Sequence, residues 1–259
     1  GCHDDVSALH DGVWHRIAVF SLRIRISHLR KVRYNHSFYM ESKRMELLYI
    51  DDRIIVCTKP PGLLSTDDPG GMPEAIRREL GDTSTSIRSV HRLDRVVGGV
   101  MVYARTRRAA SELSAQMREG LFHKTYLAVV SGTPETARAE LFDWLQRDTR
   151  RHKTYVVPEG AENAQEATLS YETLASDEGT ALLSVSLHTG RTHQIRCQLS
   201  AHGMPIVGDI KYGGCEGPGV ALWSHRLSFL HPRTGERLIF SALPSDPEPW
   251  DRLIKAAGL

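Results

Sequence analysis

The chain has 259 residues, of which 41% are apolar and 25% are charged, and its formal net charge is +2, as in an ordinary globular protein. Its apolar stretches are too short to cross a bilayer, and its four cysteines include no C-x-x-C pair, which excludes a membrane span, a zinc knuckle and a disulfide framework. We therefore expect a cytoplasmic protein with reduced thiols and no membrane association.

Residues 1–44 differ in charge from the rest of the chain. They hold eight Lys or Arg residues against four acids, a balance of +4, which leaves 2 − 4 = −2 for residues 45–259. They show neither helical nor alternating periodicity, although their charge also suits an arm that binds nucleic acid. We therefore expect a basic N-terminal extension over 1–44, either disordered or not native, and one folded domain over 45–259.

From Met45 onward, short strands alternate with a few helices. In chain order, the sequence predicts two strands of a hairpin (48–50, 54–57), a helix (73–80), a strand (99–104), a helix (107–119), a strand (124–131), two further strands (167–174, 181–188), a helix (192–201), two strands (221–230, 237–240) and a final helix (248–257). Strands mostly follow strands through turns. We therefore expect an α+β fold with a mixed, largely antiparallel central sheet and flanking helices.

Two short segments place one carboxylate among Arg and His side chains. The first is HRLDR at 91–95, and the second is GRTHQIR at 190–196. Lys124-Thr125-Tyr126 lies between them. An acid, a phenol and a guanidinium can thus be assembled without a metal-ligand set or a nucleotide-binding loop. This combination suggests an active site that handles an anionic polymer.

These segments resemble those of RluA-type pseudouridine synthases. The resemblance also includes LLYIDD at 47–52, KPPG at 59–62 and HGMPIVGD at 202–209, in matching order and spacing over roughly residues 45–243. It implies the pseudouridine synthase fold, with an active-site cleft across the sheet. It also implies an RNA isomerase that breaks the bond from uracil N1 to ribose, turns the base and rejoins it through C5. That reaction needs neither cofactor nor metal, because it involves no net redox change.

The resemblance assigns three catalytic residues. Asp94 matches the catalytic carboxylate, which either adds covalently or removes a ribose proton. Tyr126 matches the active-site tyrosine on which the extracted base stacks. Arg196 matches the basic residue that pairs with Asp94 and keeps it ionised. Without the resemblance, a structural ion pair would be the favoured interpretation of Asp94. The alternatives for Tyr126 and Arg196 are a core tyrosine and a surface or helix-packing arginine.

RNA, either ribosomal or transfer, is the partner that the resemblance implies, with a slight preference for ribosomal RNA. The target uridine must leave its stack to reach Asp94, which favours loops and bulges of structured RNA. His91 and His193 are expected to shape loops or to bond the backbone rather than to act as acids. Six residues are expected to contact RNA: Arg92, Arg191, His193, Arg150, Arg151 and Lys153. The alternative is that they are solvated surface charges.

One departure from the family pattern follows the catalytic residue. Val97-Gly98-Gly99 stands where the family commonly has Thr-Ser-Gly, so two hydroxyls that would brace the loop are missing. The alternative function is therefore a non-catalytic RNA-binding or RNA-chaperone protein on the same scaffold, although retention of the three catalytic residues argues against it. A hydrolase is disfavoured, because the sequence has no G-x-S-x-G turn and no metal-binding His pair. We expect a monomer without a protein partner.

Overall fold

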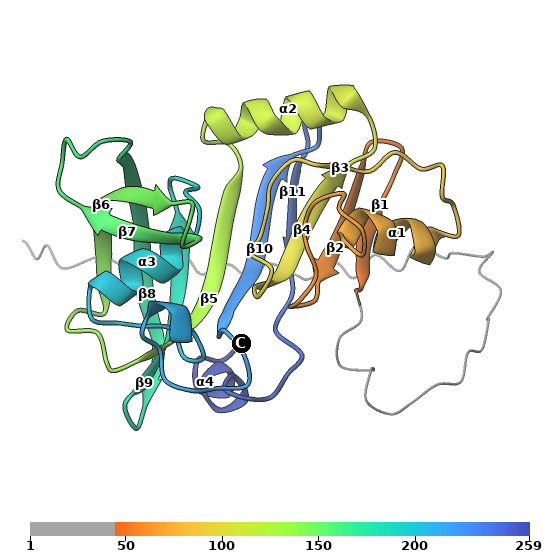
Figure 1. The fold of residues 1–259 in the computed structure, drawn as a ribbon. Helices are drawn as coiled ribbons and strands as arrows, with labels where there is room; N and C mark the ends of the chain where they lie inside the picture. The colour runs from red at the N-terminus through yellow and green to blue at the C-terminus, as the bar shows by residue number, and fades with distance from the viewer. Residues whose placement is uncertain (1–44) are drawn as a thin grey trace, which may run out of the picture. The chain divides into compact units, whose positions relative to one another are not determined.

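The computed structural model describes residues 45–259, which form an 11-stranded sheet with helices against it (Figure 1). The extension predicted over 1–44 lies outside the described residues. Within 45–259, no helix is both long and apolar enough to cross a membrane. The expected α+β class with a mixed sheet is confirmed.

The strands, in chain order, are β1 (Leu47–Ile50), β2 (Ile54–Lys59), β3 (Arg88–Ser89), β4 (Gly98–Ala104), β5 (His123–Ser131), β6 (Arg138–Asp148), β7 (Lys153–Val157), β8 (Gln165–Asp177), β9 (Thr180–Leu187), β10 (Leu222–Leu230) and β11 (Arg237–Ser241). Their spatial order is β1-β2-β4-β10-β5-β9-β8-β6-β7, with β3 beside β4 and β11 beside β10. The one parallel pair in the described sheet joins β4 to β10, where Gly98 faces Trp223 and Gly99 faces Ser224. All its other pairs are antiparallel.

The central strands β2 and β4 are buried on both faces, which explains why they read as continuous apolar runs. Ile55 and Met101 join one hydrophobic core, whereas Ile54 and Val100 join a second core on the other face. Helix α1 (Met72–Leu80) packs into the first core. Helix α2 (Arg107–Arg118) covers the second and crosses one end of the strands in Figure 1.

The ends of these two helices follow from local sequence. Thr106 caps α2, because its side chain accepts a hydrogen bond from the backbone N–H of Ala109. Gly120 follows the helix with φ +72°, in the left-handed region that glycine adopts readily. Helix α1 has Pro73 in its first turn and ends at Gly81, whose φ is 65°. Both helices lie where the sequence predicts them.

The other half of the domain contains two strands that the prediction omitted. Strands β6 and β7 form an antiparallel hairpin, and β6 also pairs with β8 along eight residues. Only Leu141 and Leu145 of β6 are buried, so the strand lacks the apolar alternation that would reveal it. Helix α3 (Gln194–Ala201) and the 3-10 turn η2 (Ile210–Tyr212) lie against this half, and α4 (Asp251–Ala256) packs on β8 and β9.

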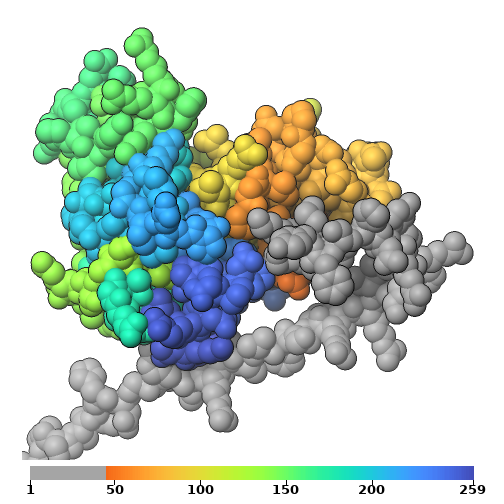
Figure 2. All heavy atoms as spheres, turned by 60° about the horizontal axis from the view of Figure 1, so that its bottom comes forward, coloured from red at the N-terminus to blue at the C-terminus, as the bar shows by residue number. Residues whose placement is uncertain are grey.

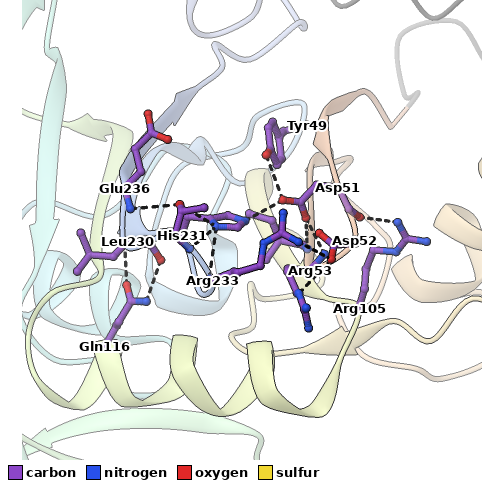
Figure 3. A network of polar contacts seen from close by, with 12 residues as sticks. Tyr49, Asp51, Asp52, Arg53, Arg105, Gln116, Leu230, His231, Arg233 and Glu236 are labelled. Carbon is purple, nitrogen blue, oxygen red and sulfur yellow. Dashed lines mark hydrogen bonds and ion pairs between the residues drawn. The ribbon is translucent and has the colours of Figure 1, made fainter.

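A polar network joins the turns at one end of the sheet to α2 (Figure 3). The His231 ring lies 2.7 Å from a carboxylate oxygen of Asp51, which also accepts a hydrogen bond from the Tyr49 hydroxyl. The Gln116 side-chain amide pairs with both backbone groups of Leu230, at 2.8 Å each. These polar contacts hold the β1–β2 turn, the β10–β11 turn and α2 together, in addition to the apolar packing of the second core.

Candidate active site

A cleft of about 860 Å³ lies between the loop that precedes β4 and the segment that leads into α3. In Figure 2 the yellow part of the chain, near residue 100, lies against the light-blue part, near residue 200. The cleft is lined by one carboxylate among the described residues, that of Asp94, and by seven cationic side chains, those of Arg92, Arg95, Lys124, Arg147, Arg191, Arg196 and Lys211. Such a surface suits a polyanion with one acid at its centre.

Asp94 lies on a loop that other residues hold firmly. The Ser65 hydroxyl donates to the carbonyl of Leu93 and accepts from its N–H, at 2.9 and 3.0 Å. The buried Lys59 ammonium donates to the carbonyl of Arg95 at 3.2 Å. Burial lowers the pKa of Lys59 to about 8, against the opposing attraction of Asp94. The backbone around Asp94 is therefore fixed by a serine and a lysine that the sequence analysis did not single out as site residues.

Arg196 joins two carboxylates across the floor of the cleft. Its Nη1 lies 3.0 Å from an oxygen of Asp94, and its Nε and Nη2 lie 2.6 and 2.8 Å from the two oxygens of Asp209. Asp209 is 1% exposed, so this bidentate pair is shielded from water. Burial disfavours the charge on Arg196, but the hydrogen bonds and charges of Asp209 and Asp94 outweigh it and raise the pKa of the guanidinium. Arg196 therefore presents a fixed positive charge to Asp94.

Tyr126 projects from β5 into the same cleft and is 5% exposed. Burial, with a further contribution from the charge of Asp94, raises the pKa of its phenol. The hydroxyl therefore stays protonated near neutral pH. Among residues 45–259 no hydrogen bond engages this hydroxyl, so both the ring and the hydroxyl are available to a ligand.

His193 lies beside Asp94 and is oriented by Tyr212. Its Nδ1 lies 2.8 Å from the Tyr212 hydroxyl, which also accepts a hydrogen bond from the backbone N–H of Thr154. The other ring nitrogen, Nε2, lies 3.7 Å from an oxygen of Asp94. Burial is the main cause that lowers the pKa of His193, although Asp94 opposes it. The ring therefore lies beside Asp94 in its neutral form near neutral pH.

The structure divides the predicted RNA-binding residues into two groups. Arg92, Arg191 and His193 line the cleft, and the Arg191 Nε also donates to the carbonyl of Glu166 at 2.8 Å. The remaining three lie outside the residues that line the cleft, in or next to the turn between β6 and β7, and are Arg150, Arg151 and Lys153.

Lys153 lies with its Nζ 5.0 Å from the ring centre of Tyr212, so it borders the group that orients His193. His91 bonds the backbone as expected, because its Nε2 accepts from the N–H of Val102 at 3.2 Å. The fold adds further residues to the site that sequence reasoning did not predict, among them Lys59, Lys124, Asp209 and Tyr212. The available signal for each of these was only its place within or near a matched segment.

Within the Val97-Gly98-Gly99 segment, the two glycines are required by the packing of β4 against β10. A Cβ on Gly98 would lie 2.4 Å from the Trp223 ring, and one on Gly99 would lie 2.3 Å from the backbone oxygen of Ser224. Gly99 also has φ +122°. The two hydroxyls are therefore missing where β4 and β10 approach each other closely. The loop that carries Asp94 is held instead by the hydrogen bonds between Ser65 and Leu93.

Comparisons with known proteins agree with this geometry. A family model described as RNA pseudouridylate synthase matches residues 53–201. An uncharacterized RNA pseudouridine synthase of Bacillus subtilis, YjbO, is 35% identical over 228 residues, which are 82% of this chain and 76% of that protein. The dual-specificity RNA pseudouridine synthase RluA of Escherichia coli is 35% identical over 213 residues, 77% of this chain and 93% of RluA. Human RNA pseudouridylate synthase domain containing 1 shares the fold, with TM-score 0.67 at 20% identity over 87% of this chain and 98% of that one.

Proposed function

The chain belongs to the RNA pseudouridylate synthase family and isomerises uridine in RNA to pseudouridine, and we propose that Asp94, Tyr126 and Arg196 carry out this reaction. The observation that carries the proposal is the position of Asp94 as the single carboxylate among the described residues that line a strongly cationic cleft. Tyr126 lines that cleft, and Arg196 bonds Asp94 directly.

Each of the three groups has a distinct role in the proposal. The Asp94 carboxylate acts on the uridine, because it is the available anionic group beside the position of the base. The Tyr126 ring forms a face on which the flipped uracil stacks while it turns, since stacking tolerates rotation better than directional hydrogen bonds do. Arg196, anchored on Asp209, holds Asp94 in place and favours its ionised form.

The proposed substrate is a uridine in a loop or bulge of structured RNA, with ribosomal RNA as the first candidate and transfer RNA as the second. Arg92, Arg191 and His193 are positioned to contact the RNA beside the flipped nucleotide. Arg150, Arg151 and Lys153 are proposed to contact the backbone farther from it. We also propose a monomer acting in the cytoplasm, because the proposed site is assembled from one chain and its substrate is RNA.

The proposal is tested by pseudouridine mapping in cells that lack the gene. Carbodiimide labelling and reverse transcription on total RNA identify the modified uridine, and complementation compares wild type with Asp94→Asn. We expect wild type to restore one or a few sites and Asp94→Asn to restore none, because the amide keeps the shape but loses the charge. With purified protein, turnover should fall by about 1000-fold or more while RNA affinity stays within about threefold.

Asp251→Asn on α4 is the matched control, since its carboxylate pairs with Lys255 at the surface. It should restore the map as wild type does. A map that wild-type protein leaves unchanged in expressing cells would support the binding-only alternative. Near-normal turnover by Asp94→Asn would remove Asp94 from its role.

A further inference from the structure

Lys124 is a cleft residue for which the reaction as described above has no role. It lies two residues before Tyr126 on β5, and both side chains line the cleft with Asp94. Residues two apart on a strand point to the same face, about 7 Å from each other. The Lys124 side chain therefore lies on the same face of β5 as the Tyr126 ring, on which the base is proposed to stack.

The surroundings of Lys124 leave its charge without an anion. Among the described residues, no hydrogen bond or ion pair reaches its Nζ, and its recorded partner is the Phe122 ring, with the ring centre 5.8 Å away. Burial lowers the pKa of this ammonium, which shows that the site is partly removed from water. A cation in such a place is costly unless an anion joins it.

The nearest polar groups cannot supply that anion. The cleft carboxylate, Asp94, is already bonded to Arg196 at 3.0 Å. His91 is neutral, and its Nε2 already accepts from the backbone N–H of Val102. The Lys124 Nζ lies 3.8 Å from the position of a Cβ on Gly190, which places it beneath the turn that opens the GRTHQIR segment. The missing anion must therefore come from the ligand.

We propose that Lys124 binds a backbone phosphate flanking the flipped uridine, an inference that rests on the proposed function. The stacked base at Tyr126 and the phosphate at Lys124 would then fix one nucleotide at two points along a single strand. This contact would position the ribose between them, beside Asp94. It would be independent of base identity, as phosphate contacts are.

The test uses a synthetic RNA hairpin that carries the uridine identified by the cellular map. Affinity is measured by fluorescence anisotropy at several salt concentrations, in the Asp94→Asn background so that the uridine is not converted. Lys124→Met keeps the aliphatic packing on Phe122 but removes the charge. We expect about tenfold weaker binding at low salt, and a plot of log affinity against log salt that is less steep by about 0.7 to 0.9, the change for one lost phosphate contact.

A second measurement separates a phosphate contact from a folding defect. Hairpins with an uncharged methylphosphonate on either side of the uridine should weaken binding by protein with Lys124 at one of the two positions, and should cause no further loss with Lys124→Met. The control Lys255→Met, on the surface of α4, should bind all hairpins as its parent does.

Two results would overturn the inference: an unchanged salt dependence for Lys124→Met, or methylphosphonates that leave binding by protein with Lys124 unaffected at both positions. Failure of the proposed function would look different, because wild-type protein would then leave the unmodified hairpin unconverted.

Discussion

At the scale of single residues, the close approach of Gly98 to Trp223 limits which residue can occupy position 98, after the loop that carries Asp94. The Trp223 ring is 8% exposed, and its Nε1 donates to the carbonyl of Ala242 at 2.8 Å, so the ring has little freedom to move. A Cβ at position 98 would also lie 2.9 Å from Pro61. Gly98 is therefore part of the packing beneath the site, and its replacement by a larger residue would affect the loop that carries Asp94.

Gly98→Ser, which restores the residue common in the family, should destabilise this protein. Overpacking against a fixed ring costs about 1–3 kcal/mol, and urea unfolding of the purified variant measures it. Gly219→Ser is the control, because a Cβ there meets no atom within 4 Å. An equally stable Gly98→Ser variant with faster turnover would show instead that the missing hydroxyl limits the enzyme.

The residues of the site were predictable to the extent that they lie in matched segments. Asp94, Tyr126 and Arg196 were identified from sequence, and the fold brings all three to one cleft. Asp209 was included in a matched segment without a role, because nothing in a sequence shows that a carboxylate 13 residues away will meet Arg196. Lys59 was hidden in the same way, since its contacts are with the backbone carbonyls of Pro60, the next residue, and of Arg95 in the loop that carries Asp94.

At the scale of elements, α2 is attached to the sheet by a polar contact as well as by its apolar face. Gln116 is 8% exposed and satisfies both the N–H and the carbonyl of Leu230, where β10 ends (Figure 3). Ala109 and Leu113 of the same helix pack on the second core. The amide thus occupies a helix position where periodicity alone predicts an apolar residue.

Gln116→Ala should lower the free energy of unfolding by about 2 kcal/mol, because it leaves two partly buried backbone groups unpaired. Urea unfolding followed by circular dichroism measures this loss. Glu112→Ala, an exposed position on the same helix, should change stability by less than about 0.5 kcal/mol. Equal effects of the two substitutions would mean that water replaces the amide at Leu230.

The elements that sequence reasoning located are those with a strong local signal. The continuous apolar runs of β2 and β4 and the capped amphipathic helix α2 were all predicted. The β6–β7 hairpin was missed because backbone pairing with β8, rather than apolar burial, defines it. The three basic residues Arg150, Arg151 and Lys153, which the sequence predicts to contact RNA, thus lie in or next to the turn of a β-hairpin.

At the scale of the whole molecule, folding distributes the charged side chains unevenly, which composition cannot reveal. The sequence assigns residues 45–259 a net charge of −2 by subtraction, yet the cleft gathers seven cationic side chains around Asp94. Folding therefore concentrates positive potential where a polyanion must enter and leaves the compensating acids elsewhere. Folding also buries some ionisable groups, and their burial makes the free energy of unfolding of the domain depend on pH.

His91 provides the clearest case. It is 7% exposed, and burial, helped by the charge of Lys124, lowers its pKa to about 3 from 6.5. Between these two values the unfolded chain binds a proton at His91 that the folded chain does not, so acid favours unfolding. His91 therefore imposes no such penalty above pH 6.5, and its penalty grows as the pH falls towards 3.

His91→Gln should remove this dependence, because a Gln carbonyl can still accept the hydrogen bond from Val102 but does not titrate. Between pH 7 and pH 4, wild type should lose about 3 kcal/mol more of its unfolding free energy than the variant does, at about 1.4 kcal/mol per pH unit below 6.5. Urea unfolding at several pH values measures the difference. His123→Gln, an exposed histidine at the start of β5, should follow wild type, since solvent surrounds its side chain in both states. Parallel pH profiles for wild type and His91→Gln would mean that the domain opens around His91 before it unfolds, which admits the proton without a global cost.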